Sequence, residues 1–519
     1  MNTFSMAANT SNHAHLIRGL GLIAAISVII GNVIGTGVFL KARVMTCNLG
    51  SAEWVLIAWI AAGLLSLAGA LTYAELTAMK PEAGGEYVFL RDAYGGLWSF
   101  LFGWMQIFIA KAGAQASVAV VFAIGLNDFF GGGLKKTLLQ TNLFGSTFEI
   151  TSLQLLAILM IVVFTAINCG SVSFSGQVAS FLTFVKIALI VFVGFGAFLF
   201  VSGGNFGHFG MTEAGGVCEG VNASVRFGSA NYSFLAGFGA AMLGALWGYD
   251  GWNNLTFVAG EVKDPKRNIP IAIIGSTILV IILYVFVHIG YFYLLDPTSI
   301  ASVSKDSSVA KVIVSKFFAG DVATFATGIC VALFTIGLML SSLGTLHTSI
   351  LAGSRVSYAM AKDRYFPKAL SKLSVTHVPV RSLVAQGVWA SILALSGSFD
   401  SLTDYVIFGS WIFYALVTSS IFVFRKKEPN AERPYKAFGY PIIPVVFLFV
   451  AVGLLIQTVA TDFAPGLALI KEQQYFTGLN AIIFSPSVRG LFLIALGLPF
   501  YYYFNWRQNA EPTKSEPEN

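Results

Sequence analysis

The stretch Gly31-Asn32-Val33-Ile34-Gly35-Thr36-Gly37 lies inside a long apolar run near the N-terminus and places three glycines within seven residues. In a helix each glycine costs about 1 kcal/mol relative to alanine. A second apolar run contains Gly248-Tyr249-Asp250-Gly251-Trp252-Asn253-Asn254, which combines two glycines with a carboxylate. The two stretches predict two helices that are interrupted partway along their length.

The composition around these stretches is typical of a membrane protein. The chain has 519 residues, of which 56% are hydrophobic and 11% charged, whereas soluble domains carry roughly 25% charged residues. Twelve apolar stretches approach the length of about 20 residues that crosses a bilayer. They run over 17–46, 54–79, 93–125, 152–168, 174–202, 234–260, 269–295, 323–354, 382–397, 402–424, 440–461 and 487–505. Because the runs are continuous rather than alternating, they predict helices and not membrane strands.

The predicted spans divide the chain into two groups of five and a final pair. The expected order is a polar tail at 1–16, five spans within 17–202, five within 234–424, two within 440–505, and a tail at 506–519. The two glycine-rich stretches then fall in the first and sixth spans. Glycine-interrupted spans at matching positions point to an inverted-repeat transporter and its binding site.

The first stretch has two alternative interpretations. Gly31 and Gly35 form a GxxxG pair, which by itself is equally typical of a helix-packing face. A dinucleotide fingerprint is excluded because no strand precedes the glycines. The matching stretch in the sixth span favours a broken helix over packing alone.

A broken helix supplies the chemistry that an amino acid needs. Its ends leave free N–H groups on one side and free C=O groups on the other, and each end carries about half a unit of dipole charge. A zwitterion presents a carboxylate to the first set and an ammonium to the second. Irregular backbone at membrane depth is tolerated where it lines a cavity.

The placement of lysine and arginine predicts the orientation. With the N-terminus in the cytoplasm, 19 of the 31 basic residues fall in inner segments and 10 in outer segments, while Lys111 and Lys186 lie inside spans. The split predicts a multi-pass protein of the cell (inner) membrane with both termini cytoplasmic. It also accounts for the net charge of +6, since the basic residues form no aromatic-laced groove that would bind nucleic acid.

A charged side chain inside a predicted span indicates a functional or structural role, because placing a charge in mid-membrane costs roughly 2.5–3.5 kcal/mol. We expect a functional role for Asp250, in the sixth-span break, and for Lys186, in the fifth span. Lys111, in the third span, is equally consistent with a packing salt bridge and with a pocket residue. Glu75 lies near the inner end of the second span, where we expect it to pair with loop cations.

The four cysteines occur in no CxxC or CxxH spacing, so we expect no metal site and no cofactor. Cys47 and Cys218 both fall in predicted outer segments, where the alternatives are a disulfide between them or two free thiols. His288 and His347 sit singly in apolar stretches, where they either pack between helices or couple protons.

The sequence resembles the amino acid–polyamine–organocation (APC) superfamily of transporters, and within it the bacterial relatives of the L-type amino acid transporters. The resemblance runs from about Gly19 to the end of the eleventh span. It rests on 31–39; on Tyr249-Asp250-Gly251-Trp252-Asn253 with Glu261 and Asn268-Ile269-Pro270; on Ser354-Arg355 through Tyr358-Ala359-Met360-Ala361 to Phe366-Pro367; and on Arg433-Pro434-Tyr435-Lys436.

The resemblance implies a LeuT-type 5+5 inverted repeat with discontinuous helices 1 and 6, followed by two extra helices. By position it implies that N–H groups of three residues receive the substrate carboxylate: Gly35, Thr36 and Gly37. It implies that carbonyls of three residues receive the ammonium: Ile34, Trp247 and Tyr249. Gly248, between the last two, is also expected to bind substrate. Trp247 falls at the family's aromatic gate. Three further residues fall where the family faces its substrate: Ala114, Ser410 and Trp411.

Lys186 falls on the helix-five lysine of the family's sodium-independent members. We expect its ammonium to take the place of a sodium ion and to donate hydrogen bonds to carbonyls freed near Gly31 and Ile34, with Ser341 or Ser342 as neighbours. The alternative is a lysine that snorkels to the inner interface. It lies about twelve residues into its span, which is deep for that role.

Two departures from the family pattern bear on gating and partners. Where the family often has two glutamates after helix six, this chain has Gly260-Glu261, which leaves the inner gate open to question. Mammalian members carry a cysteine in the loop between helices three and four for a heavy-chain partner. Residues 126–151 contain no cysteine, so we expect no disulfide-linked heavy chain.

The sequence therefore predicts a sodium-independent amino acid transporter, an exchanger working by alternating access, with neutral L-amino acids favoured and no enzymatic activity. Its expected partners are its amino acid substrate and the lipid bilayer. A cationic amino acid is an alternative substrate, because the Asp250 carboxylate could pair with its side chain. Proton coupling is a further alternative, because burial disfavours the charged form of Lys186. A non-transporting amino acid sensor is the alternative from another class. A channel is disfavoured, because it would need rings of like groups around a symmetric pore.

Overall fold

The computed structural model describes residues 16–143, 146–201, 203–212, 215–230, 232–305, 307–318, 324–396 and 399–510. The predicted tail at 1–16 lies outside these residues except for its last position, and so do residues 511–519 of the predicted C-terminal tail.

The described chain is helical almost throughout. The first half contains α1 (Leu22–Val33), α2 (Gly37–Leu49), α3 (Ala52–Met79), α4 (Glu86–Tyr94), α5 (Gly96–Met105), the π-helix η1 (Gln106–Ala110), α6 (Lys111–Phe129), α7 (Ser152–Asn168), α8 (Val172–Leu199), and the 3-10 helices η2 (Phe206–Gly210) and η3 (Ala223–Val225). The second half contains α9 (Phe234–Tyr249), the 3-10 helix η4 (Asn254–Glu261), α10 (Pro265–Leu294), α11 (Pro297–Ala301), α12 (Val309–Val314), α13 (Thr324–Lys362), the 3-10 helix η5 (Lys368–Ser371), α14 (Val380–Ser396), α15 (Phe399–Lys427), α16 (Ile442–Lys471), α17 (Tyr475–Ile483), α18 (Pro486–Ala495) and α19 (Gly497–Ala510).

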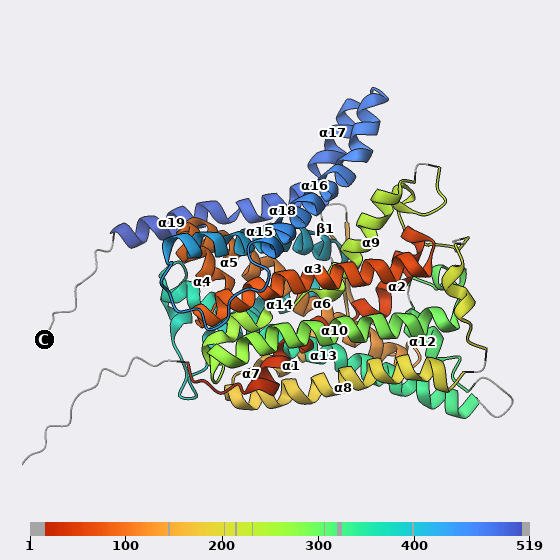
Figure 1. Cartoon of the computed structure of the whole chain (residues 1–519), viewed down its shortest axis with the longest axis horizontal. Helices are drawn as coiled ribbons and strands as arrows, with labels where there is room; N and C mark the ends of the chain where they lie inside the picture. The colour runs from red at the N-terminus through yellow and green to blue at the C-terminus, as the bar shows by residue number, and fades with distance from the viewer. Residues whose placement is uncertain are drawn as a thin grey trace, which may run out of the picture.

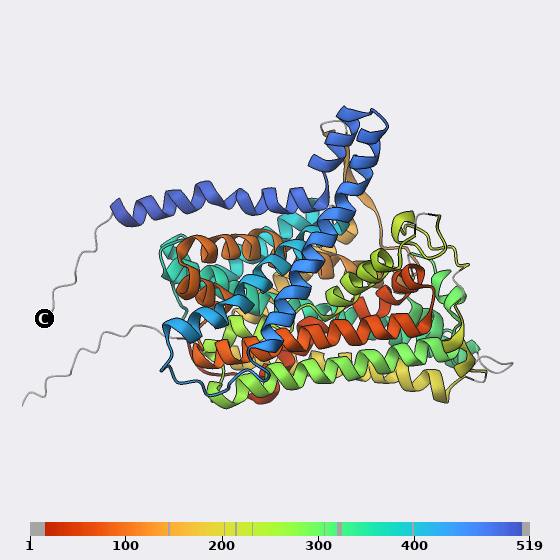
Figure 2. The same cartoon turned by 45° about the horizontal axis from the view of Figure 1, so that its top comes forward.

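The long helices form one bundle whose members run broadly along its longest axis (Figures 1 and 2). Helices distant in the chain lie side by side: α10 packs on both α3 and α8, and α1 packs on α8, α10 and α13. The hairpin of α16 and α17 rises out of the bundle in both views. The breaks in the first and sixth spans therefore lie within a packed interior.

Local sequence signals explain where several helices begin and end. The side chains of Ser51 and Ser171 accept hydrogen bonds from N–H groups in the first turns of α3 and α8, and Thr151 forms a capping box with Gln154 at the start of α7. Helix α2 ends at Gly50, whose φ of +67° is the left-handed conformation that favours glycine.

Within the described residues, nine helices are long and apolar enough to cross a membrane. Two of the other expected spans, Ser152–Asn168 and Val380–Leu395, are apolar but shorter. The expected sixth span at 234–260 is not one helix, because α9 ends at Tyr249 and the chain resumes as η4. The protein is an α-helical, multi-pass membrane protein, and its count of twelve crossings remains a prediction.

Several helices extend beyond the predicted spans. The helix that contains the span predicted at 93–125 runs from Gly96 through η1 to Phe129, after a separate helix α4. The helices that contain the spans predicted to end at 354, 461 and 505 continue to Lys362, Lys471 and Ala510, and α17 lies outside the predicted spans. A window of about 20 apolar residues finds the membrane-embedded part of a helix, and a helix does not have to stop at the interface.

The chain also contains one small β-hairpin, which the prediction of an all-α protein did not include. Strands β1 (Thr137–Leu143) and β2 (Ser146–Thr151) pair antiparallel, with Thr137 opposite Thr151. The hairpin lies in the connection between α6 and α7. The spanning part of the molecule is thus helical, as predicted.

The two cysteines predicted to lie in outer segments are joined. Cys47 at the end of α2 and Cys218 form a disulfide with their Cα atoms 5.7 Å apart. The sequence left open a disulfide or two free thiols, and the structure has the disulfide. Cys169 and Cys330 are free.

Candidate functional site

The first span is interrupted between Val33, where α1 ends, and Gly37, where α2 begins. Ile34 has extended backbone angles, with φ −75° and ψ 91°. A Cβ placed on Gly35 would lie 3.8 Å from the Thr345 hydroxyl, an ordinary van der Waals contact, so the backbone here is not crowded. The break leaves the N–H groups at the start of α2 without partners in the helix.

The sixth span is interrupted directly after Tyr249. Asp250 leaves the helical conformation, with φ −57° and ψ 138°, and Gly251 has a φ of +110°, a conformation that side chains disfavour. A Cβ on Gly251 would also lie 2.9 Å from the Cβ of Asn32 in α1. Glycine at 251 therefore permits both the turn and the close approach of the two broken spans.

The two breaks meet one another. A Cβ on Gly37 would lie 3.0 Å from the Cα of Gly248, so the start of α2 packs directly on the end of α9. The hydroxyl oxygen of Tyr284, in α10, lies 2.9 Å from the carbonyl oxygen of Val33 and 3.0 Å from that of Gly248. One tyrosine thus holds both interrupted backbones in register.

A cavity of about 130 Å³ lies at this junction and is lined by both breaks together with η1, α6, α13 and α15. Nine of the predicted substrate-binding residues line it: Gly35, Thr36, Gly37, Ala114, Trp247, Gly248, Asp250, Ser410 and Trp411. Lys111 lines it too, which favours the pocket role over a packing salt bridge.

Two predicted residues lie away from the cavity lining. The Ile34 carbonyl already accepts hydrogen bonds from Lys186 and, at 3.4 Å, from the Ser341 hydroxyl. Tyr249 is buried against the rings of Trp59 and Tyr284. Their carbonyl groups were assigned by position along the chain, whereas packing decides which way each peptide group faces.

Further lining residues were not identified from the sequence. They are Asn32, Val33, Gln106, Ala110, Gly113, Ser117, Val118, Leu246, Asn254, Thr345, Ser349 and Tyr414. Most are small or polar residues within apolar helices. Polarity in a span was the available signal, but many polar residues of this chain are buried elsewhere in the bundle.

Lys186 of α8 is fully buried and its ammonium nitrogen faces the first break. The nitrogen lies 2.6 Å from the carbonyl oxygen of Gly31, 2.5 Å from that of Ile34 and 2.7 Å from the hydroxyl of Thr345. An ammonium has three donors, and here all three have an acceptor. The lysine therefore joins α8, the broken end of α1, and α13.

The serines expected beside Lys186 take different positions. The Ser341 hydroxyl donates to the same Ile34 carbonyl, whereas the Ser342 hydroxyl donates to the carbonyl of Leu338, one turn back in α13. The hydroxyl in contact with the ammonium belongs to Thr345. It lies one helical turn beyond Ser341 and hence on the same face of α13.

Polar side chains around the second break form a connected group. The hydroxyl of Tyr414 donates a 2.6 Å hydrogen bond to Asp250. The ammonium of Lys111 donates to the amide oxygen of Asn254 and lies 4.8 Å from the centre of the Phe257 ring. Helices α6 and α15 thereby fix the irregular segment between α9 and η4.

A buried carboxylate behind this group was not singled out from the sequence. Glu86 begins α4, is fully buried, and accepts a 2.8 Å hydrogen bond from the amide of Asn253. The N–H of Gly84, just before it, donates to the Phe257 carbonyl at 2.9 Å. A glutamate directly after two glycines, at the point where a helix begins, was the missed signal.

Ion pairs close the end of the bundle that bears the predicted inner loops. The Arg355 guanidinium binds both oxygens of Glu261 at 2.7 and 2.9 Å, and both side chains are buried. The prediction that Glu75 pairs with loop cations is confirmed, because Arg425 and Arg433 lie 2.7 and 3.3 Å from its oxygens. The single glutamate of Gly260-Glu261 thus has a defined partner.

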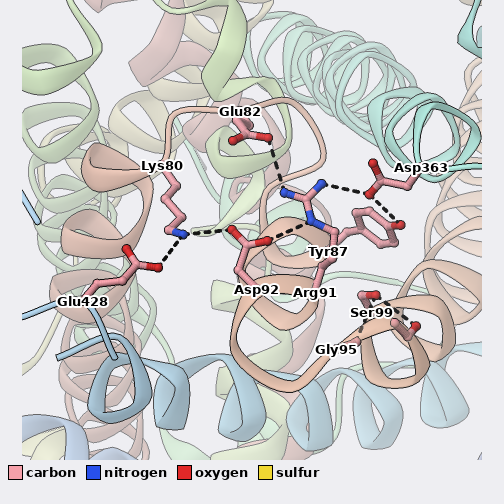
Figure 3. A network of polar contacts seen from close by, with 10 residues as sticks. Lys80, Glu82, Tyr87, Arg91, Asp92, Gly95, Ser99, Asp363 and Glu428 are labelled. Atoms are coloured by element: carbon pink, nitrogen blue, oxygen red, sulfur yellow. Dashed lines mark hydrogen bonds and ion pairs between the residues drawn. The ribbon is translucent and has the colours of Figure 1, made fainter. Parts of the chain in front are cut away.

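A second network at this end joins α4 to the residues that directly follow α3, α13 and α15 (Figure 3). Arg91 in α4 binds Asp363 at 2.9 Å and Asp92 at 2.8 Å, and Lys80 binds Asp92 at 2.9 Å and Glu428 at 3.0 Å. Burial alone would raise the pKa of Asp92, but its hydrogen bonds to Arg91 and Lys80 outweigh burial and lower that pKa.

The broken helices, the polar cavity between them and the surrounding apolar bundle define a multi-pass transporter whose binding site is built from interrupted backbone. Residues 20–484 match the family model described as "Amino acid permease". The chain belongs to the amino acid permease family of the APC superfamily and is therefore an amino acid transporter of the membrane and not an enzyme.

The curated relatives are similar over nearly their whole length. The chain is 30% identical to the serine/threonine exchanger SteT of Bacillus subtilis (strain 168) over 462 residues, covering 88% of this chain and 94% of the relative. It is 28% identical to the b(0,+)-type amino acid transporter 1 of Mus musculus over 494 residues, covering 95% and 90%. It is also 28% identical to the large neutral amino acids transporter small subunit 2 of Oryctolagus cuniculus over 482 residues, covering 92% and 83%.

Proposed function

We propose that this protein is a sodium-independent amino acid exchanger that works by alternating access on a LeuT-type 5+5 inverted repeat, with neutral L-amino acids as its favoured substrates. We further propose that it lies in the cell (inner) membrane with both termini in the cytoplasm. The observation that supports the mechanism best is the position of the Lys186 ammonium against the first break.

The ammonium of Lys186 does the work that a bound cation would do there. It neutralises the partial negative charge of the carbonyl groups at the broken end of α1 and holds that end against α13 through Thr345. All its donors are occupied, which leaves no vacant cation-binding position at this nitrogen. A site completed by its own lysine needs no sodium ion.

The two breaks supply complementary ends for a zwitterion. N–H groups of Gly35, Thr36 and Gly37 lie at the start of α2, where the helix dipole favours the substrate carboxylate. Carbonyl groups at the end of α9 lie where the dipole favours the ammonium, and Trp247 and Gly248 line the cavity there. Each of these carbonyls already accepts a hydrogen bond: that of Gly248 from Tyr284, that of Trp247 from the Asp250 N–H, and that of Ile34 from both Lys186 and Ser341. Ile34, which accepts two, is the weakest candidate.

The names of the relatives support exchange and do not fix one substrate. SteT is named as a serine/threonine exchanger, and the rabbit relative as a transporter of large neutral amino acids. The cavity is lined by both small and aromatic residues, among them Gly35, Ala114 and Trp247. An amino acid with a cationic side chain is the second candidate substrate, because Asp250 lines the cavity and could pair with it.

The proposal is tested by amino acid exchange in proteoliposomes, in choline and in sodium buffer, with and without a pH gradient. We expect equal exchange in both buffers, a loss of at least tenfold for Lys186→Ala, and normal exchange for the surface variant Lys426→Ala. A strict sodium requirement of the natural protein would refute sodium independence. Substrate binding with no counterflow in any condition would indicate a sensor instead.

A further inference from the structure

Glu86, at the start of α4, is a fully buried carboxylate beside the break in the sixth span. One of its oxygens, Oε1, accepts the 2.8 Å hydrogen bond from the amide of Asn253. The other oxygen, Oε2, is also buried and has no hydrogen-bond partner among the described residues. An ionised carboxylate in this position would be costly, because burying a charge requires both a counter-charge and hydrogen bonds.

The charged groups that face Glu86 leave its charge uncompensated. Asp250, in the break, repels it, and Lys111 of α6 attracts it. The ammonium of Lys111 attracts Asp250 as well and donates a hydrogen bond to Asn254. With both carboxylates ionised, this buried group would therefore carry one net negative charge. The two phenol groups that face Glu86 from α3 and α15 are neutral: Tyr73 and Tyr414.

Other charged groups on the elements around Glu86 already bind one another. They lie toward the end of the bundle that bears the predicted inner loops and form three sets: Glu75 with Arg425 and Arg433, Glu261 with Arg355, and Arg91 with Asp92 and Asp363. The guanidinium groups of these sets are thus bound to other carboxylates. Within the described part of the chain, none of them forms an ion pair with Glu86.

We propose that Glu86 binds a proton, and that the protein reaches the conformation described here only with that proton bound. The proton removes the net negative charge of the buried group. It also makes Oε2 a hydroxyl donor, which can pair with the hydroxyl of Tyr73, a buried group that has no hydrogen-bond partner either. This role rests on the proposed function, since it governs one step of the same transport cycle.

The packing around Glu86 favours a proton over a metal ion or a water molecule. Glu86 does not line the cavity between the broken helices, and a Cβ on the preceding Gly85 would lie 2.6 Å from the carbonyl carbon of Thr256. A metal ion needs several oxygen ligands at once, and the described part of the chain contains no group of three acidic, histidine or cysteine side chains that could hold one. A water molecule needs a cavity of its own. A proton needs neither space nor further ligands.

The proton is linked to the substrate site through the irregular segment between α9 and η4. Asn253, which binds Oε1, adjoins Asn254, which lines the cavity. The N–H of Gly84 donates to the Phe257 carbonyl at 2.9 Å and so attaches the start of α4 to η4. A rearrangement of the break would therefore change the surroundings of Glu86, and contact with water there would favour loss of the proton.

The test combines infrared spectroscopy with transport measurements on the purified full-length protein. At about pH 7 exposed carboxyl groups are ionised, so the C=O stretching band of a protonated carboxyl group reports a buried one. We expect this band in the natural protein and its loss in Glu86→Gln, which keeps the size of the side chain and can still accept a hydrogen bond from Asn253. Glu53→Gln, at the exposed start of α3, is the matched control and should keep the band.

Amino acid exchange in proteoliposomes is measured with the same pH on both sides, from about pH 5.5 to about pH 8.5. Exchange by the natural protein and by Glu53→Gln should fall by about fivefold or more as the pH rises, because Glu86 loses its proton. Glu86→Gln cannot ionise and should lose this dependence.

Three results would overturn the proposal: no such band in the natural protein, an unchanged band in Glu86→Gln, or a pH dependence of exchange that persists in Glu86→Gln. The first result needs no variant, so it tests the proposal even if Glu86→Gln does not fold. A band from Glu86 without exchange in any condition refutes the proposed function alone, and exchange without the band refutes this proposal alone.

Discussion

The hydroxyl of Tyr414 in α15 donates a 2.6 Å hydrogen bond to the carboxylate of Asp250, at the point where α9 is interrupted. Asp250 lines the cavity between the broken helices, and Lys111 in the same lining attracts it electrostatically. The carboxylate is therefore held in the cavity wall by one hydrogen bond, with a compensating charge nearby.

Asp250→Asn should lower transport of lysine or arginine at least tenfold more than transport of alanine or leucine. The reason is that a hydrogen bond to a charged group contributes about 1.5–3 kcal/mol, and only a cationic side chain would lose it. Uptake of each radiolabelled amino acid into proteoliposomes measures the ratio. Tyr414→Phe, which keeps the charge, should change the ratio less. An equal fall for all substrates would show that Asp250 has a structural role.

Trp247→Ala should reduce exchange at least tenfold while the protein remains folded in detergent. The indole lines the cavity, lies against the start of α2, and has the ammonium of Lys41 4.7 Å from its ring centre. Burying an aromatic ring stabilises a complex by a few kcal/mol. Trp54→Ala, on the exposed face of α3, serves as the control. Normal exchange by a well-folded Trp247→Ala protein would remove this residue from the gate.

Gly37→Ala should impair exchange and lower thermal stability, because the added methyl group would lie 3.0 Å from the Cα of Gly248 and 3.1 Å from the Trp247 ring. Overpacking of this kind costs about 1–3 kcal/mol. Gly275→Ala, in α10, has no atom within 4 Å of the new Cβ and should be neutral. Melting temperature and exchange rate are compared for the two variants. If the two variants had equal melting temperatures and exchange rates, the close contact between α2 and α9 would not be required.

The network around Asp92 should make stability depend on acidity (Figure 3). The folded state lowers the pKa of Asp92 below its ordinary value through Arg91 and Lys80. This contribution is therefore complete above the ordinary value, near pH 4, and is lost as the pH falls through the lowered pKa. Asp92→Asn should reduce the acid-dependent loss of melting temperature below about pH 4. If the melting temperatures of the variant and the natural protein fell equally with pH, Asp92 would not be the group responsible.

Cys47→Ser and Cys218→Ser should each destabilise the protein by about 2–4 kcal/mol, since a disulfide restricts the unfolded chain, and this one joins residues 171 apart. The double variant should be no less stable than either single one, because both remove the same bond. Cys330→Ser removes a free thiol and should leave the disulfide unaffected. Peptide mapping without reductant should find the 47–218 pair, and its absence would show two free thiols.

The sequence by itself determined the class of the protein, the approximate positions of its spans, and the two breaks. Each of these depends on local properties: hydropathy over about 20 residues, and the weakness of glycine-rich helix at 31–37 and 248–254. The family resemblance, and not a local property, gave the expectation that the Lys186 ammonium lies near the Gly31 and Ile34 carbonyls, and the structure has it there.

Only the tertiary structure decided which side chains complete the site. Thr345, Tyr414 and Asn254 come from three separate elements, and each reaches the site through the rotation of its helix or turn, which packing against neighbours fixes. Glu86 likewise meets Asn253 across 167 positions of the chain. No local signal encodes such contacts, because polar residues in apolar helices can face the cavity, a neighbouring helix or their own backbone. The fold selects one of these by bringing distant segments together.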